Sequence, residues 1–108
     1  MRAEGQALVD RIEASLALIR RSLDWDQALR RLDELSARVE DPNLWNDPKQ
    51  AQAITREQKQ LGDAVKAVNE ISAEMSDAVE FVEMGDAEGD DSVVKDGLNS
   101  LTALAERA

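Results

Sequence analysis

Apolar side chains recur along the chain at the three- and four-residue steps of an α-helix, without the strict alternation of a strand. They predict a first helix over about residues 3–21, a second that ends near Glu40, a long third helix over about residues 48–84 and a short last helix. The fold class is therefore expected to be all-α: one domain over residues 1–108, built as an antiparallel bundle of three to four helices. The predicted core positions are Leu8, Ile12, Leu16, Ile19 and Leu23; Leu29, Leu32, Leu35 and Val39; Ala51, Ile54, Gln58, Leu61, Val65, Val68, Ile71 or Ser72, Met75, Val79 and Val82; Val94, Leu98, Leu101 and Leu104 or Ala105.

Two aspartates carry the signals for helix starts. Asp24 is a candidate N-cap whose capping box is completed by Gln27, which predicts a restart after Leu23. Because such a box also occurs inside long helices, the first two helices are either separate or continuous at Leu23. Asp47 precedes Pro48, whose fixed φ suits a first helical position and whose missing N–H is not needed there. This pair predicts a strong start for the long helix.

The turn between the second and third helices holds one of the two tryptophans. Pro42 disfavours helical geometry at the residue before it and so ends the second helix. A tryptophan beside a helix start is usually tucked against neighbouring helices, so Trp45 is expected to pin this corner to the bundle. Trp25 is expected to pack in the same way. The alternative is that either ring is an exposed anchor for a partner.

Glycine and acidic residues mark the end of the long helix. Gly85 is the expected residue just past that helix, followed by an acidic loop over residues 86–91. Asp91 or Ser92 is expected to cap the last helix, which Gly97 weakens. No stop signal closes the last helix, so the sequence is expected to continue in a longer protein.

Charge is distributed unevenly along the chain. Thirteen basic and 23 acidic side chains give a net charge of −10, of which residues 61–108 carry −9. Such an excess of acid argues against a chain that binds nucleic acid through its own electrostatic field. Asp77, Glu80 and Glu83 follow one another at three-residue steps and are expected to line one exposed, solvated side with a docking role. The pattern of an EF-hand calcium loop is absent.

Missing residue types exclude several functions. Without cysteine there is no disulfide, thiolate nucleophile or zinc finger, and without histidine the commonest metal ligand and general base are absent. The longest uncharged run, residues 97–105, is far shorter than the ~20 residues that span a bilayer. The first residues lack the apolar stretch of a signal peptide. What remains is a cytoplasmic chain without membrane contact, which either recognises a partner or relies on carboxylates and arginines alone.

Two pairs of arginines are the remaining candidates for chemistry. The pairs at residues 20–21 and 30–31 are expected to be solvated and to pair with acids one helical turn away, such as Glu34. The alternative is an arginine-lined pocket for a dicarboxylate.

Three short segments carry the most specific pattern in the sequence. They are Leu23-Asp24-Trp25-Asp26, Leu32-Asp33-Glu34-Leu35 and Asp41-Pro42-Asn43-Leu44-Trp45-Asn46-Asp47-Pro48, followed by Ala51-Gln52 and Arg56-Glu57. Together they resemble the amino-terminal domain of the bacterial peptide chain release factor 2 family, among the class I release factors. The resemblance is good over residues 23–61 and lies mainly in helical pattern and acidity elsewhere.

The resemblance implies the helical first domain of a cytoplasmic factor that directs translation termination at UAA and UGA. That family reads the stop codon through a Ser-Pro-Phe tripeptide and triggers hydrolysis through a Gly-Gly-Gln motif, and neither occurs in this chain. No catalytic, cofactor-binding or metal-binding residue, and no cofactor, is therefore expected here. The implied partners are the ribosome, at the stalk base of its large subunit, and the release-factor GTPase, with little direct nucleic-acid binding and a monomeric state.

Two other classes stay open beside the release-factor domain. One is a small, cofactor-free helical enzyme of the chorismate mutase type, which also combines a long helix with arginines around a dicarboxylate. The other is a coiled-coil module that dimerises through the helix over about residues 48–84, although the heptad spacing drifts there.

Overall fold

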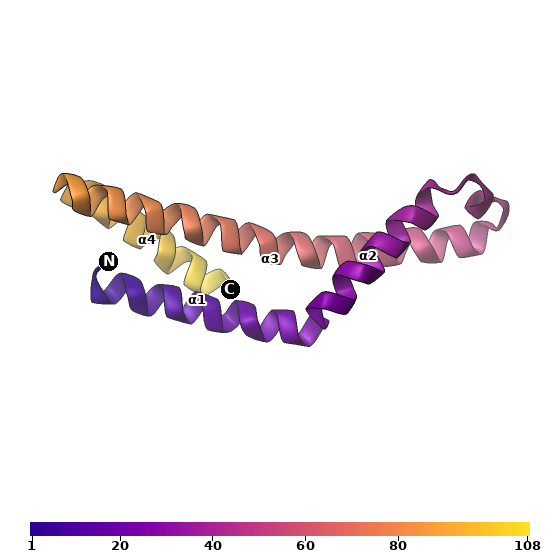
Figure 1. The fold of residues 1–108 in the computed structure, drawn as a ribbon, viewed down its shortest axis with the longest axis horizontal. Coiled ribbons are helices and arrows are strands. Elements are labelled where there is room, and N and C mark those ends of the chain that lie inside the picture. The colour runs from indigo at the N-terminus through magenta and orange to yellow at the C-terminus, as the bar shows by residue number, and fades with distance from the viewer. The chain divides into compact units, whose positions relative to one another are not determined.

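The computed structural model describes residues 1–108 and contains only helices and their connections (Figure 1). The all-α prediction with one long helix is confirmed, and the long helix ends four residues later than predicted. The elements in chain order are α1 (Ala3–Leu23), α2 (Trp25–Glu40), the 3₁₀ helix η1 (Pro42–Asn46), α3 (Pro48–Glu88) and α4 (Asp91–Arg107).

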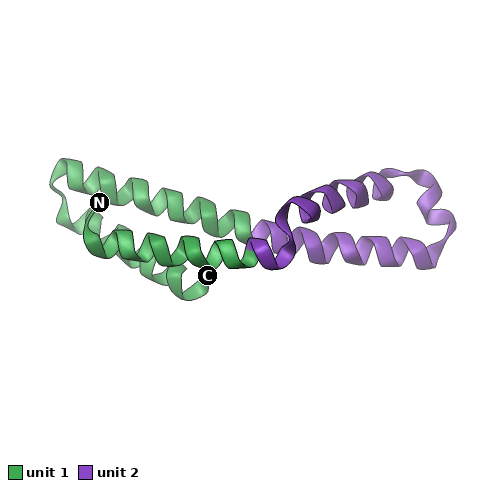
Figure 2. Cartoon of the chain, turned by 60° about the horizontal axis from the view of Figure 1, so that its bottom comes forward, with its two compact units in different colours: residues 1–19, 68–108 green, residues 20–67 purple.

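The chain divides into two compact units, coloured separately in Figure 2. Unit 1 comprises residues 1–19 and 68–108, and unit 2 comprises residues 20–67. The long helix α3 contributes its second half to unit 1 and its first half to unit 2.

Unit 1 is built from most of α1, the second half of α3 and all of α4. α3 runs antiparallel to the other two helices (Figure 1). All three helices contribute apolar side chains to its interior, because each has its apolar residues on one face. Buried there are Val9, Ile12, Leu16, Val68, Met75, Ala78, Val82, Val94, Leu101, Leu104 and Ala105.

Unit 2 is a helical hairpin in which η1 turns the chain from α2 back into α3. Its core cluster is Leu35, Leu44, Ala51 and Ile54, against which Val39 and Leu61 pack in part. Ala28 and Val65 are also buried in this unit. Leu29, predicted to face the core, is instead 37% exposed, and its neighbour Ala28 is buried. The other predicted positions of α2 keep their places, since Leu35 is buried and Leu32 and Val39 are partly buried.

The break between α1 and α2 is a single residue, so the two helices are separate. Asp24 adopts the left-handed conformation, with φ 52° and ψ 71°, and its side chain forms no capping hydrogen bond. The predicted capping box at Asp24 is therefore wrong. Aspartate is among the few residues that tolerate this conformation, and here its backbone rather than its carboxylate ends one helix and begins the next.

The predicted start of the long helix is confirmed. The Asp47 carboxylate accepts a hydrogen bond from the backbone N–H of Gln50 at 3.2 Å, which satisfies one of the unpaired donors of the first turn of α3. Asp41 does the same for η1, because its carboxylate accepts from the N–H of Asn43 at 3.0 Å.

The connection from α3 to α4 differs from the prediction. α3 continues through Gly85 and ends at Glu88, and Gly89 supplies the positive φ, 68°, of a helix C-terminus. The predicted acidic loop is thus mostly helical. The cap of α4 is Asp90, not Asp91 or Ser92. Its carboxylate accepts hydrogen bonds from the backbone N–H groups of Ser92 at 3.1 Å and Val93 at 3.2 Å.

Gly85 and Gly97 allow α3 and α4 to approach closely in unit 1. A Cβ atom on Gly85 would lie 2.9 Å from the backbone nitrogen of Val94, and one on Gly97 would lie 2.5 Å from Cγ2 of Val82. Any larger residue would force the helices apart. This requirement explains why glycine occupies both positions, although glycine weakens a helix.

Candidate functional site

Trp45 is exposed, which corrects the prediction that it packs against the bundle. Its side chain is 58% exposed, whereas the preceding Leu44 is buried in the core of unit 2. Successive side chains of the tight η1 helix point in different directions. Only one of Leu44 and Trp45 can therefore pack into the corner between α2 and α3, and Leu44 does so.

The Trp45 ring borders a shallow hollow of about 420 Å³ at the start of α3. Pro48, Lys49, Gln52 and Thr55 line it with a buried alanine. Tryptophan is enriched among the residues that contribute most to binding between proteins. The exposure of Trp45 removes the packing prediction and leaves the alternative, an anchor for a partner, as a hypothesis.

Trp25 and the arginine pairs are distributed along unit 2 rather than gathered in one pocket. The Arg20 guanidinium lies over the Trp25 ring, 5.5 Å from its centroid, and Trp25 is half-buried. Arg31 pairs with Glu34 at 3.4 Å, as predicted. Arg20 thus contacts an aromatic ring and Arg31 forms an ion pair, so one arginine of each pair has its own local partner.

A bidentate ion pair joins α2 to α3, and sequence reasoning missed it. Arg31 donates through Nε and Nη2 to the two carboxylate oxygens of Glu57, at 2.7 and 2.8 Å. These hydrogen bonds hold the pKa of the Glu57 carboxyl below its ordinary value and raise the pKa of Arg31. Beside this pair, the Gln58 amide donates to the Ser36 hydroxyl at 3.2 Å. No local signal marks a pair 26 residues apart.

The Arg31–Glu57 pair predicts a pH-dependent stability. Because the pKa of Glu57 is lower in the folded than in the unfolded chain, its contribution is fully present above the ordinary glutamate pKa of about 4.3. That contribution is lost as the pH falls through the lowered value. Urea denaturation is expected to show Glu57→Gln less stable than the natural chain at neutral pH, with the difference vanishing in acid. An unchanged difference at low pH would contradict the pairing. Glu34→Gln is the control, since its single contact is long and exposed.

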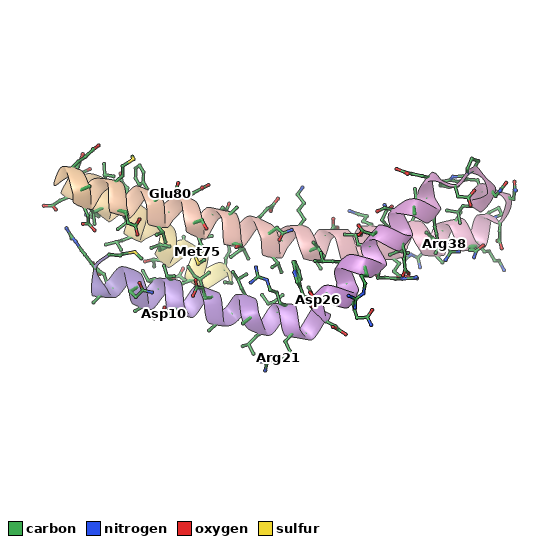
Figure 3. The ribbon with its side chains drawn as sticks, viewed as in Figure 1. Asp10, Arg21, Asp26, Arg38, Met75 and Glu80 are labelled. Carbon is green, nitrogen blue, oxygen red and sulfur yellow. The ribbon has the colours of Figure 1, made fainter.

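The net charge of the chain lies entirely in unit 1. That unit has four basic and fourteen acidic side chains, whereas unit 2 has nine of each. Asp77, Glu80 and Glu83 are all exposed, as predicted, and Figure 3 shows Glu80 on the outer side of α3 while Met75 points toward the neighbouring helices. Asp86 differs from these three, because Arg2 pairs with it at 3.5 Å.

The acidic side chains of unit 1 are spread rather than convergent. No three carboxylates in the chain come close enough together to hold a metal ion. Arg2 also contacts Asp91 at 3.2 Å, and Arg107 of α4 contacts Glu74 of α3 at 2.9 Å.

None of the helices has the length and apolar character that crossing a membrane requires. The two candidate surfaces are thus the exposed Trp45 corner of unit 2 and the acidic outer side of unit 1.

Comparison with known proteins gives matches along the whole chain. Residues 28–108 match the PCRF domain family. Over all 108 residues the chain is 46% identical to peptide chain release factor 2 of Paramagnetospirillum magneticum and of Ruegeria sp., and it is 48% identical over 85 residues to that of Caulobacter sp.. It spans 29% of the length of the first two proteins and 23% of the third, in their amino-terminal part. By the extent of the domain match, the chain belongs to the PCRF domain family.

Proposed function

We propose that residues 1–108 form the amino-terminal helical domain of a peptide chain release factor that directs translation termination at UAA and UGA. The observation that carries the proposal is the 46% identity to release factor 2 proteins over every residue of the chain.

The role proposed for this domain is docking rather than chemistry. We assign no catalytic, cofactor-binding or metal-binding residue to it. The partners proposed for it, the stalk base of the large ribosomal subunit and the release-factor GTPase, are those that the resemblance to release factor 2 implies. The strongly acidic unit 1 is better suited to protein contacts than to ribosomal RNA, which it would repel. The factor is proposed to act in the cytoplasm as a monomer.

Peptide release by the longer factor tests the termination function. The coding sequence beyond Ala108 is expected to contain Ser-Pro-Phe and Gly-Gly-Gln. The purified full-length protein is expected to release formylmethionine from ribosomes that carry UAA or UGA in the decoding site, and not from ribosomes that carry UAG. A stop codon directly after Ala108, or equal release at all three codons, would contradict the proposal.

Charge reversal on the outer side of α3 tests the docking role. Glu80 and Glu83 are exposed and have no ion pair in the structure, so Glu80→Lys with Glu83→Lys removes surface charge without breaking a contact. In the full-length factor this double variant is expected to slow GTPase-dependent recycling severalfold, because rim charges govern the rate of association. Ribosome binding is expected to stay unchanged.

The matched control reverses two acids elsewhere in unit 1. Glu13→Lys with Asp96→Lys makes the same change in net charge on α1 and α4, where both carboxylates are exposed. The control is expected to leave recycling near its natural rate. Equal slowing in both double variants would indicate a general effect of net charge. A change in ribosome binding by the α3 variant would contradict the proposal that this side of α3 faces away from ribosomal RNA.

A further inference from the structure

A groove lies between α3 and α4 within unit 1. It has a volume of about 480 Å³ and is open to solvent. Small side chains on α4 leave the space above a buried leucine, and α3 supplies an aromatic side wall. The lining residues that the argument uses are Asp77, Phe81, Ser100, Ala103, Leu104 and Arg107.

The floor and one wall of this α3–α4 groove are apolar. Leu104 at its floor is buried, whereas Phe81 on its wall is 38% exposed. Met84, one helical turn beyond Phe81, is 53% exposed and extends the apolar strip along α3. Large apolar side chains that remain exposed beside a hollow are typical of protein contact sites.

The groove lining has two carboxylates and one cation, which leaves one carboxylate without an ion pair. Arg107, the one cation in the lining, is already paired with Glu74 at 2.9 Å. Asp77 lies one turn before Phe81 on α3 and has no ion pair. An apolar side chain that enters the groove would therefore have the Asp77 carboxylate next to it.

The charge of the whole unit restricts what can occupy the groove. Unit 1 has a net charge of −10, so a second copy of the chain or an RNA would bring like charge against the groove and its unpaired Asp77. An apolar residue flanked by lysines or arginines would instead gain both burial and charge complementarity.

We propose that the α3–α4 groove docks a basic amphipathic segment of a partner protein, with an apolar side chain against Phe81 and Leu104 and a flanking cation beside Asp77. The proposal rests on the docking role proposed above and names the chemistry of the partner. Peptide release and peptide binding are separate measurements, so failure of this inference is distinguishable from failure of the termination function.

The test is the affinity for a synthetic helical peptide that presents leucines on one face with lysines beside them, measured by fluorescence anisotropy. Phe81→Ser and Asp77→Lys are each expected to weaken binding about tenfold. The matched controls are Leu18→Ser and Glu13→Lys on α1, which change an exposed apolar residue and an exposed acid outside the groove. They are expected to change the affinity by less than about twofold. Circular dichroism of each variant confirms that the helices remain.

Several outcomes would overturn the inference. These are equal loss of affinity in the groove and control variants, equal binding of a peptide with glutamates in place of the lysines, and tighter binding of a single-stranded RNA. Dimerisation in sedimentation equilibrium that Phe81→Ser abolishes would assign the groove to a second copy. Binding by residues 1–108 but not by the full-length factor would show that a later segment of the same chain covers the groove.

Discussion

Replacing Leu35 by alanine is expected to lower the free energy of unfolding by about 2–5 kcal/mol, the range for truncating a buried leucine. Leu35 is 0% exposed and lies in the core cluster of unit 2 with Leu44, Ala51 and Ile54. The cluster is small, so few neighbouring side chains can move to fill the cavity left behind. Urea denaturation followed by far-ultraviolet circular dichroism measures the loss.

Leu29→Ala is the matched control for Leu35→Ala. Both leucines lie on α2, and the sequence pattern places both on the same apolar stripe. Leu29 is 37% exposed, so its truncation is expected to lower the free energy of unfolding by about 1 kcal/mol, clearly less than the truncation of Leu35. Comparable losses for the two variants would contradict the difference in burial between Leu29 and Leu35.

Replacing Gly97 by alanine is expected to destabilise unit 1 by about 1–2 kcal/mol, even though alanine is the better helix former. The new Cβ would meet Cγ2 of the buried Val82 at 2.5 Å and its backbone nitrogen at 3.3 Å. Overpacking of this kind costs about 1–3 kcal/mol, against a gain of up to about 1 kcal/mol in helix propensity. The same urea denaturation measures the net result.

The variant Gly62→Ala measures the gain in helix propensity without the steric clash expected for Gly97→Ala. Gly62 lies in the interior of α3, and the nearest atom to an added Cβ is Cδ1 of Leu32 at 3.8 Å, an ordinary contact. This variant is expected to stabilise the chain by about 0.5–1 kcal/mol. Stabilisation of similar size by Gly97→Ala would show that α3 and α4 do not approach as closely as described.

The sequence predicts the helices well because their signals are local and periodic. On α3, the predicted positions Ala51, Ile54, Val65, Val68 and Val82 are all buried. Asp47 caps α3 as predicted, because a cap depends only on residues within one turn. These parts of the fold follow from short-range geometry.

The errors arise where tertiary contacts decide between two local possibilities. Gly85 and Gly89 are equally good candidates to end α3 by local rules, and the close approach of α4 at Gly85 leaves Gly89 as the end. Leu44 and Trp45 are neighbours of which one fills the corner of unit 2. Local sequence patterns do not tell which of the two glycines lies against α4, or which of Leu44 and Trp45 packs into the corner of unit 2.

The candidate surfaces were predicted only in part, for the same reason. The exposed carboxylates of α3 follow from their spacing, since a run of acids rarely faces a core. The α3–α4 groove depends on Ser100 and Ala103 lying opposite Phe81, which is a contact between distant segments. The Arg31–Glu57 pair likewise depends on how α2 lies against α3.

Both tryptophans of the chain, Trp25 and Trp45, belong to unit 2, and unit 1 has none. Intrinsic fluorescence excited at the indole band therefore reports on unit 2 alone. Since the Trp45 ring is already largely in water, its emission changes little on unfolding, and the half-buried Trp25 supplies most of the signal. The natural sequence thus contains an optical probe confined to one unit, against which the helical signal of the whole chain can be compared.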